Sequence, residues 1–331
     1  MTSASISTKS GFFSWLRELG GSPATGPIRQ ALITLITLIL FLGLWHITAA
    51  QINTSLGQLP GPVQVTEQAK SLWAEHREER GKETAFYERQ DARNAKKLEK
   101  NPDAEVKWRT YNGRPTFIDQ IFTSLKTVFV GFAIASLFAI PAGIVCGLSA
   151  TFYNAVNPLI QVFKPVSPLA WLPLVTMVVS ALYVSDDPWL EKSFLVSAIT
   201  VTLCCLWPTL INTTVAVSGV DKDLINVSKV LRLPAFTHIR KIVIPSAIPG
   251  IFTGLRLSLS VGWMVLIAAE MLAQNPGLGK FVWDEFQNGS SQSLARIMVA
   301  VFAIGIIGFM LDRGMLALQK AVSWDKSAAL R

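Results

Sequence analysis

The chain has 331 residues, of which 50% are hydrophobic and 16% are charged. Its mean hydropathy of +0.40 lies far above that of a soluble domain with an ordinary polar surface. The composition therefore indicates a membrane protein. The net charge of +8 does not indicate nucleic-acid binding, because the basic residues do not gather into one cationic stripe with interleaved aromatic residues.

The N-terminal part of the chain predicts a membrane anchor preceded by a surface helix. Within a cytoplasmic segment 1–29, residues 11–19 predict a helix lying on the membrane surface, because their large apolar side chains share one helical face: Phe12, Trp15, Leu16 and Leu19. Residues 31–50 form an apolar run long enough to cross a hydrocarbon core of roughly 30 Å. A cleaved signal peptide is the weaker alternative, because this run exceeds the usual length of about 7–15 residues.

Five more apolar runs follow, each bounded by charged residues, proline, asparagine or glycine. They are residues 127–150, 165–184, 193–217, 248–272 and 294–311. Prolines inside these runs, such as Pro141, Pro173 and Pro208, are tolerated because neighbouring helices in a bundle satisfy the freed backbone groups. The sequence therefore predicts an all-α membrane protein with about six transmembrane helices.

The orientation follows from the basic residues in the short loops. With the N-terminus inside, the cytoplasmic side collects Lys9, Arg17, Arg29, Lys164, Lys222, Lys229, Arg232, Arg240, Lys241, Arg313, Lys320, Lys326 and Arg331. The short outer loops hold only Lys192, Lys280 and Arg296. Both termini are therefore predicted to be cytoplasmic.

Residues 51–122 form a long polar region that this orientation places outside the membrane. Its charged part, residues 67–109, predicts a long polar helix that ends at Asn101 and Pro102 and is interrupted by Gly81, with a favourable pair between Glu78 and Lys82. Apolar positions are sparse, so little tertiary burial is expected. Two interpretations stay open: a solvated, partly disordered insertion, and a docking element for an external partner.

The sequence predicts no catalytic site, no metal and no cofactor bound by the chain itself. His46, His76 and His238 are scattered over a span, the outer region and an inner loop, so no metal set or catalytic triad is indicated. The cysteines lie in apolar segments without paired spacing: Cys146, Cys204 and Cys205. The phosphate-loop pattern is absent, so the chain cannot hydrolyse ATP.

The inner loop between the fourth and fifth spans, residues 218–250, is more organised than a connector. Asp223 is predicted to cap a helix over residues 224–233, which Pro234 ends; a second helix over residues 236–244 leads through Pro245 and Pro249 into the next span. The first helix places its apolar side chains on one side, with basic residues nearby: Leu224, Val227, Val230 and Leu231, beside Lys222, Lys229 and Arg232. The pattern fits a knob that enters a groove on a cytoplasmic partner and, equally well, a plain amphipathic surface helix.

This loop resembles the coupling loop of binding-protein-dependent ABC importer permeases, whose pattern is E-A-A, three residues, G, nine residues, I-x-L-P. Asn226, Val227 and Ser228 take the E-A-A places, Arg232 takes the Gly place, and Ile242, Ile244 and Pro245 match the end of the pattern. Asparagine for glutamate removes a charge, and arginine for glycine adds a side chain where the family has a flexible turn.

The resemblance extends over nearly everything from about residue 123 onward. Residues 168–174, PLAWLPL, resemble the P-P-L-A-W-I-P-L segment of permeases for nitrate, bicarbonate, sulfonate and taurine, and residues 249–258 and 269–272 are similar to the same group. Residues 220–229 and 275–289 most resemble the nitrate permeases.

The resemblance implies a type I ABC importer permease in the bacterial inner membrane, working by alternating access. The expected organisation is a cytoplasmic segment 1–29, a first helix 30–50, a periplasmic polar insertion 51–122, a permease core 123–315 with a coupling loop 218–247, and a tail 316–331. The implied partners are a second copy of the chain, two cytoplasmic ATPase domains that bind ATP and Mg, and a periplasmic solute-binding protein. Nitrate is the first choice of cargo, with bicarbonate, cyanate and sulfonate or taurine as alternatives.

Two sets of residues are expected to carry the function. The ATPase-coupling set is Asp223, Leu224, Asn226, Val227, Ser228, Lys229, Val230, Leu231, Arg232, Leu233 and Pro234. The translocation-path set at the dimer axis is Trp171, Thr176, Arg256, Ser260 and Met264. For Arg256 an alternative stays open, a structural clamp onto backbone carbonyls or a neighbouring acid. A stand-alone secondary transporter is the rival function, but Glu270 near an outer helix end is its only acid well inside a span.

Overall fold

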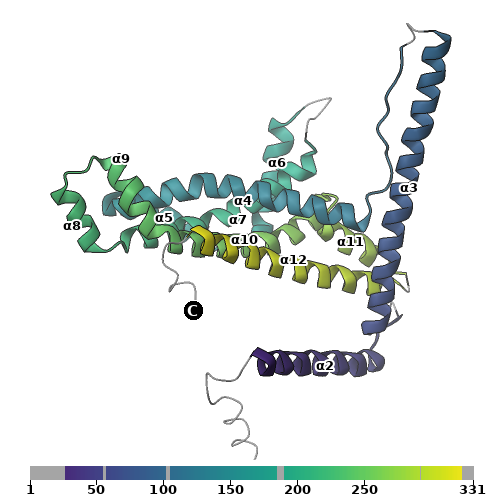
Figure 1. The fold of residues 1–331 in the computed structure, drawn as a ribbon, viewed down its shortest axis with the longest axis horizontal. Coiled ribbons are helices and arrows are strands. Elements are labelled where there is room, and N and C mark those ends of the chain that lie inside the picture. The colour runs from purple at the N-terminus through teal and green to yellow at the C-terminus, as the bar shows by residue number, and fades with distance from the viewer. Residues whose placement is uncertain (1–26, 55–56, 102–104, 185–189, 291, 323–331) are drawn as a thin grey trace, which may run out of the picture. The chain divides into compact units, whose positions relative to one another are not determined.

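The computed structural model describes residues 27–54, 57–101, 105–184, 190–290 and 292–322 (Figure 1). The predicted surface helix at residues 11–19 lies outside the described residues. The described chain forms two units, one up to Pro62 and one from Val63 onward, and each is described by itself.

The first unit contains the predicted N-terminal anchor. Helix α2 spans Pro27–Gln51 and passes the length and hydropathy test for a membrane span from Ala31 onward. It is apolar on all sides, as expected of a helix that faces lipid. A short antiparallel hairpin of β1 (Asn53–Thr54) and β2 (Gly57–Gln58) follows it.

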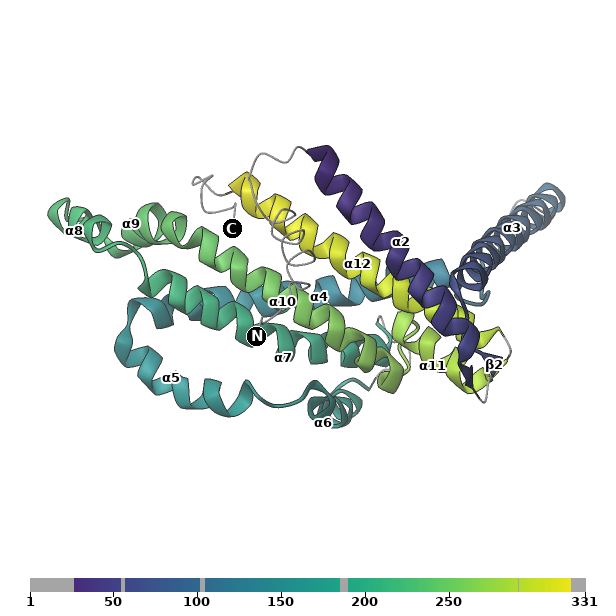
Figure 2. The ribbon, with the colours of Figure 1, turned by 90° about the horizontal axis from the view of Figure 1, so that it is seen from below.

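The second unit is a helical bundle with α7 (Lys192–Ser218) at its centre. Helices α4 (Phe117–Leu148) and α10 (Ile244–Ala273) pack along α7, and α12 (Ser293–Val322) packs on α10 (Figures 1 and 2). Short α11 (Leu278–Asn288) closes one end of the bundle, and α8 (Lys222–Val230) and α9 (Ala235–His238) lie at the other. The predicted all-α membrane fold is confirmed.

Several helices are longer than the apolar runs that predicted them. α4 begins ten residues before the predicted start at 127, because Thr116 and Asp119 form a capping box that starts the helix in a polar segment. α12 continues to Val322, so the predicted tail from residue 316 begins within a helix. Helices extend beyond the hydrocarbon core, and hydropathy detects only the part inside it.

Glycines set the close packing of α4 and α10 against α7. Gly143 and Gly147 form a G-x-x-x-G pattern on α4, and Gly250 and Gly254 form one on α10. A Cβ at Gly143 would lie 2.6 Å from Cβ of Thr213, and one at Gly254 would lie 2.7 Å from Cβ of Asn212. Small residues allow this close backbone approach. In lipid, where no water is released on association, the resulting van der Waals packing is a main source of helix association. The three helices therefore form one tightly packed layer.

The third predicted span, residues 165–184, corresponds to α6 (Pro168–Leu182), which is one half of a sharply bent pair of helices. α6 is too short to cross alone; α5 (Ala150–Phe163) passes the span test together with it, and the two are bent by 97°. Figure 2 shows α5 running beside the bundle from the end that carries α8, with α6 seen nearly end-on, and Figure 1 shows α6 standing out from the bundle. Counted with this pair, the described chain has up to six spans. The prediction failed here because α5 carries Tyr, Asn and Gln among its apolar residues, which lowers its hydropathy.

Candidate functional site

The loop between α7 and α10 contains the predicted first helix, with shifted boundaries. The prediction that Asp223 caps a helix starting at Leu224 is wrong by two residues. Asp221 is the N-cap of α8, and its carboxylate accepts the backbone N–H of Asp223 at 2.9 Å. The helix also ends earlier than predicted, at Val230, because Arg232 adopts a left-handed backbone conformation with φ of 48°.

Helix α8 presents an apolar face that no described residue covers. The exposed fractions are 42% for Leu224, 51% for Val227, 82% for Val230 and 63% for Leu231. Polar residues of the predicted coupling set are exposed beside them: Asp223, Asn226, Lys229 and Arg232. Ser228 differs, because it is buried and its hydroxyl lies 2.8 Å from Nδ1 of His238. A contiguous exposed apolar face of this kind marks an interaction surface.

The second predicted helix, residues 236–244, is not separate from the following span. α9 continues through a π-helical turn, η1 (Ile239–Val243), directly into α10, which gives one helical stretch of 39 residues from Ala235 to Ala273. Val243 and Ala247 are buried against Val217 and Val220 at the end of α7. The loop between α7 and α10 is therefore anchored in the bundle where α10 begins.

Replacement of Arg232 with glycine is expected to stabilise this loop. A non-glycine residue in the left-handed region costs about 1–2 kcal/mol. Glycine avoids this cost, but it loses more conformational entropy on folding, which offsets part of the gain. We expect a net gain of about 0.5–1 kcal/mol, measured by thermal unfolding of the solubilised complex. The control Lys229→Gly lies inside α8 and should lose about 1 kcal/mol. A loss of stability in both variants would contradict this explanation of the backbone at Arg232.

The predicted translocation-path residues are not brought together in the described chain. Trp171 lines a cavity of about 360 Å³ beside α7. Ser260 and Met264 lie on the exposed face of α10, and Thr176 donates its hydroxyl to the carbonyl of Leu172 at 2.8 Å. Their joint role at a dimer axis stays a prediction.

Arg256 is held by a neighbouring acid. Its Nε and Nη2 lie 3.1 and 2.8 Å from Oδ1 of Asp312 on α12. Both side chains are part-buried, so a charge that would be costly inside a span is compensated by its partner. The geometry agrees with the alternative of a clamp between two helices. Asp312 was not identified in the sequence analysis because 56 residues separate the two in sequence.

Within the polar region 51–122, residues Pro62–Lys100 form one helix, α3, that continues through Gly81 without a break. The predicted pair of Lys82 and Glu78 is present at 2.8 Å, and its hydrogen bond lowers the pKa of Glu78 from the ordinary value. The expectation of little burial is wrong at the base of the helix, where Leu72 and Val65 are buried.

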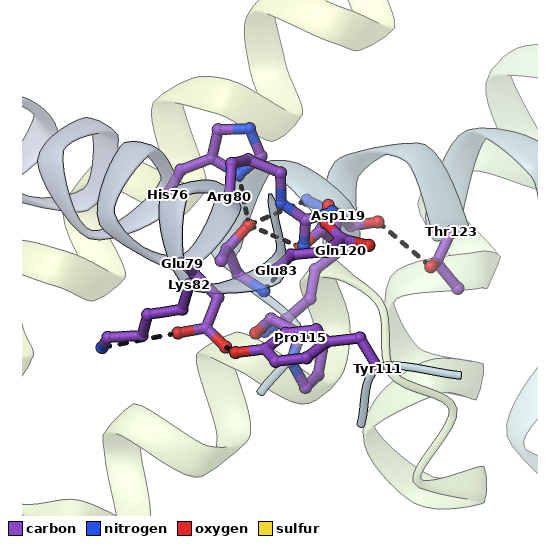
Figure 3. A network of polar contacts seen from close by, with 11 residues as sticks. His76, Glu79, Arg80, Lys82, Glu83, Tyr111, Pro115, Asp119, Gln120 and Thr123 are labelled. Atoms are coloured by element: carbon purple, nitrogen blue, oxygen red, sulfur yellow. Dashed lines mark hydrogen bonds and ion pairs between the residues drawn. The ribbon is translucent and has the colours of Figure 1, made fainter. Parts of the chain in front are cut away.

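Charged and polar contacts join α3 to the bundle. Arg80 donates to the carboxylate of Asp119 at 3.1 Å, and Nδ1 of His76 lies 2.6 Å from the hydroxyl of Thr116 (Figure 3). Arg296 on α12 contacts Glu75, and its Nη1 lies 3.1 Å from Glu285 of α11. These contacts fix the base of α3 to α4 and α12, and Arg296 extends the network to α11.

The segment after α3 returns along it. Gln90 is buried, and its amide exchanges two hydrogen bonds with the backbone of Arg109. Tyr111 donates its hydroxyl to Glu79 at 2.8 Å (Figure 3), which raises the pKa of the phenol from the ordinary value. A polar cleft of about 680 Å³ lies between α3, the start of α4 and α11.

At the same end, the buried Glu270 binds the turn between α10 and α11. Its carboxylate accepts the hydroxyl of Ser124 at 2.9 and 2.8 Å and the backbone N–H of Gly279 at 3.0 Å. A Cβ at Gly277 would collide with this carboxylate, and one at Gly279 would collide with the carbonyl of Ile267. The motif at residues 275–279 is therefore explained by packing around a carboxylate, and Glu270 serves the fold here rather than an ion site.

Comparison with known proteins identifies the family to which this chain is similar. The family described as "Binding-protein-dependent transport system inner membrane component" matches residues 139–324. The nitrate import permease protein NrtB of Synechocystis sp. is 37% identical over 203 residues, covering 61% of this chain and 69% of that protein. The bicarbonate transport system permease protein CmpB of Synechococcus elongatus is 30% identical over 315 residues, covering 95% and 94%.

The solved structures support the fold at lower sequence identity. The MetNI methionine ABC transporter in an inward-facing conformation matches with a TM-score of 0.53 and 14% identity, covering 62% of this chain and 96% of that chain. Permease subunits of this kind catalyse no reaction, because the ATPase resides in separate subunits. The family match, which spans more than half of the chain, and the near full-length relative together show that the protein is a multi-pass permease subunit of the binding-protein-dependent inner membrane family.

Proposed function

We propose that this permease imports a small inorganic anion, with nitrate as the first choice and bicarbonate as the second. Relatives named for nitrate and for bicarbonate are each 37% identical to this chain over about 200 residues, and a relative named for taurine is 30% identical over 208 residues. The similarity between the chain and the nitrate and bicarbonate permeases carries the proposal.

In the proposed assembly, two copies of the chain form the path, two ATPase domains bind the cytoplasmic loops, and a periplasmic solute-binding protein delivers the anion. Both termini lie in the cytoplasm. ATP binding closes the ATPases and moves the two coupling loops, which opens the path outward, and hydrolysis resets it. The exposed apolar face of α8 supports this role, because a face of that kind requires a partner.

The cargo is tested with the complex reconstituted in liposomes. Uptake of labelled nitrate and labelled bicarbonate is compared, with the solute-binding protein supplied outside and ATP inside. Nitrate uptake that depends on both is the expected result. Uptake of bicarbonate alone would replace nitrate as the cargo, and uptake of neither, with ATP hydrolysis intact, would reject the proposed substrate class.

Coupling through α8 is tested with Leu231→Asp. A carboxylate placed in an apolar contact costs several kcal/mol if the contact buries it fully. We expect stimulation of ATP hydrolysis by the loaded solute-binding protein to be lost, while membrane insertion persists. Lys222→Asp is the control, because Lys222 lies on the same helix outside the apolar face. Normal stimulation in the Leu231 variant would reject α8 as the coupling element.

A further inference from the structure

A lysine lies in the bend of the broken span. Lys164 is the C-cap of α5, whose 14 residues measure about 21 Å along the axis. The last turns of α5 pack against the bundle through Ile160, which is buried against Ala139 of α4 and Leu210 of α7. Lys164 therefore stands deeper than the cytoplasmic loops to which its charge assigned it in the sequence analysis.

The ammonium group of Lys164 has no partner among the residues that the structure describes. No ion pair or hydrogen bond joins it to any of them, in contrast to Arg256, which Asp312 compensates. Lys164 is exposed in the described chain, and cations among membrane-spanning helices are stable where they line water-filled cavities or transport pathways. The position of Lys164 therefore calls for a functional explanation.

The cavity beside α7 contains this lysine. Lys164 and Trp171 line it from the α5–α6 bend, and Trp207, Asn212 and Leu203 line it from α7, with Val261 of α10. These α7 residues lie around the middle of the helix (Lys192–Ser218). None of the described lining residues is acidic. The cavity therefore combines one positive charge with apolar walls and a few polar groups.

Aromatic packing positions the hydrogen-bond donors of this cavity. Phe163 stacks on Trp207 with ring centroids 6.2 Å apart and contacts Trp171 at 5.8 Å. Neither indole N–H has an acceptor among the described residues. Asn212 uses one amide hydrogen on the carbonyl of Pro208 at 2.8 Å, which orients the amide and leaves its second hydrogen available.

We propose that this cavity is a binding site for the transported anion during its passage, with Lys164 as the charge that attracts it. The inference rests on the proposed function and adds the residues that would select the charge. One ammonium group and several N–H donors suit a small monovalent oxoanion, whose oxygens accept hydrogen bonds in different directions. Binding at such a site is weak enough for release, because a single ammonium group attracts the anion and water competes for that group.

The test uses the complete complex in liposomes and compares Lys164→Gln, Lys164→Arg and the control Lys192→Gln. Lys192 is exposed at the first residue of α7, outside the cavity, and its replacement removes the same charge. Uptake of nitrate and of bicarbonate and ATP hydrolysis stimulated by the loaded solute-binding protein are measured in parallel. Lys164→Gln should lower uptake at least tenfold while stimulated hydrolysis stays within twofold of wild type. Lys164→Arg should keep a substantial part of the uptake, and the control should keep all of it.

Each remaining outcome decides the proposal. Wild-type uptake by Lys164→Gln would overturn the site and leave the proposed cargo intact, whereas failure of the wild-type complex to take up either anion would overturn the proposed function. An equal loss of uptake and hydrolysis in both Lys164 variants would also overturn the site, since it shows a structural role. If Lys164→Gln does not assemble, Trp207→Phe decides: it keeps the stacking and removes one donor. It should raise the half-saturating anion concentration, and an unchanged value would count against the site.

Discussion

Replacement of Arg256 with glutamine is expected to destabilise the bundle by about 2–3 kcal/mol, because it removes the hydrogen-bonded partner of the part-buried Asp312 carboxylate and leaves it only the more exposed and more distant Arg313 among the described residues. The second change Asp312→Asn, made in the same chain, should recover most of this loss by removing the carboxylate charge. Unfolding of the solubilised complex by denaturant measures both variants, and a double-mutant cycle isolates the pair.

Arg313→Gln is the matched control for this cycle. Arg313 is adjacent to Asp312 in sequence but more exposed, at 57%, and lies 3.7 Å from the acid, so its loss should change stability by no more than about 0.5 kcal/mol. If the effects of the Arg256 and Asp312 changes simply add, the two side chains do not act as a pair. Loss of transport with unchanged stability in Arg256→Gln would instead support a role of Arg256 in the translocation path.

Replacement of Glu270 with alanine is expected to cost about 2–4 kcal/mol. The change removes the acceptor of the Ser124 hydroxyl and of the Gly279 N–H, both of which stay buried. Hydrogen exchange at the Gly279 amide gives a local readout, which should lose protection in the variant. Global unfolding of the solubilised complex gives the magnitude.

Two further variants make the Glu270 result specific. Glu270→Gln keeps an oxygen acceptor for the Gly279 amide and should cost less than alanine. Asp284→Asn removes a half-exposed acid from the neighbouring helix α11, paired only with Lys280 at its surface, and should stay within about 0.5 kcal/mol. Equal loss in Glu270→Ala and Asp284→Asn would show that the buried contacts contribute nothing particular.

The spans could be predicted from sequence because hydropathy reports the transfer of whole helices into lipid. Runs such as 193–217 and 248–272 appear as α7 and the outer part of α10 with small shifts in their ends. The α5–α6 bend could not be predicted in the same way. Its first half is polar enough to resemble a loop, and its place in the bundle depends on packing of Ile160 against α4 and α7, which the local sequence does not reveal.

In the candidate site, too, features set by local sequence could be predicted and features set by contacts between distant helices could not. The helix predicted for coupling was located by a local pattern of caps, prolines and apolar spacing, and its exposed apolar face is present in the structure. The charges were harder to place, because the pairing of Arg256 depends on a helix 56 residues away. Likewise, the burial of Leu72 depends on polar contacts between α3 and other elements, which composition does not reveal.

The continuity of α9, η1 and α10 has a mechanical consequence. The 39 residues from Ala235 to Ala273 form a rod of about 58 Å, nearly twice the thickness of the hydrocarbon core. Gly250, Gly254 and Gly262 hold it against Ala216, Asn212 and Cys205 of α7 at three levels along its length. Because one continuous backbone joins Phe236 to this packed region, in the proposed assembly a displacement of the loop by its partner would be transmitted to α7 and α10 together, without a chain of side-chain rearrangements.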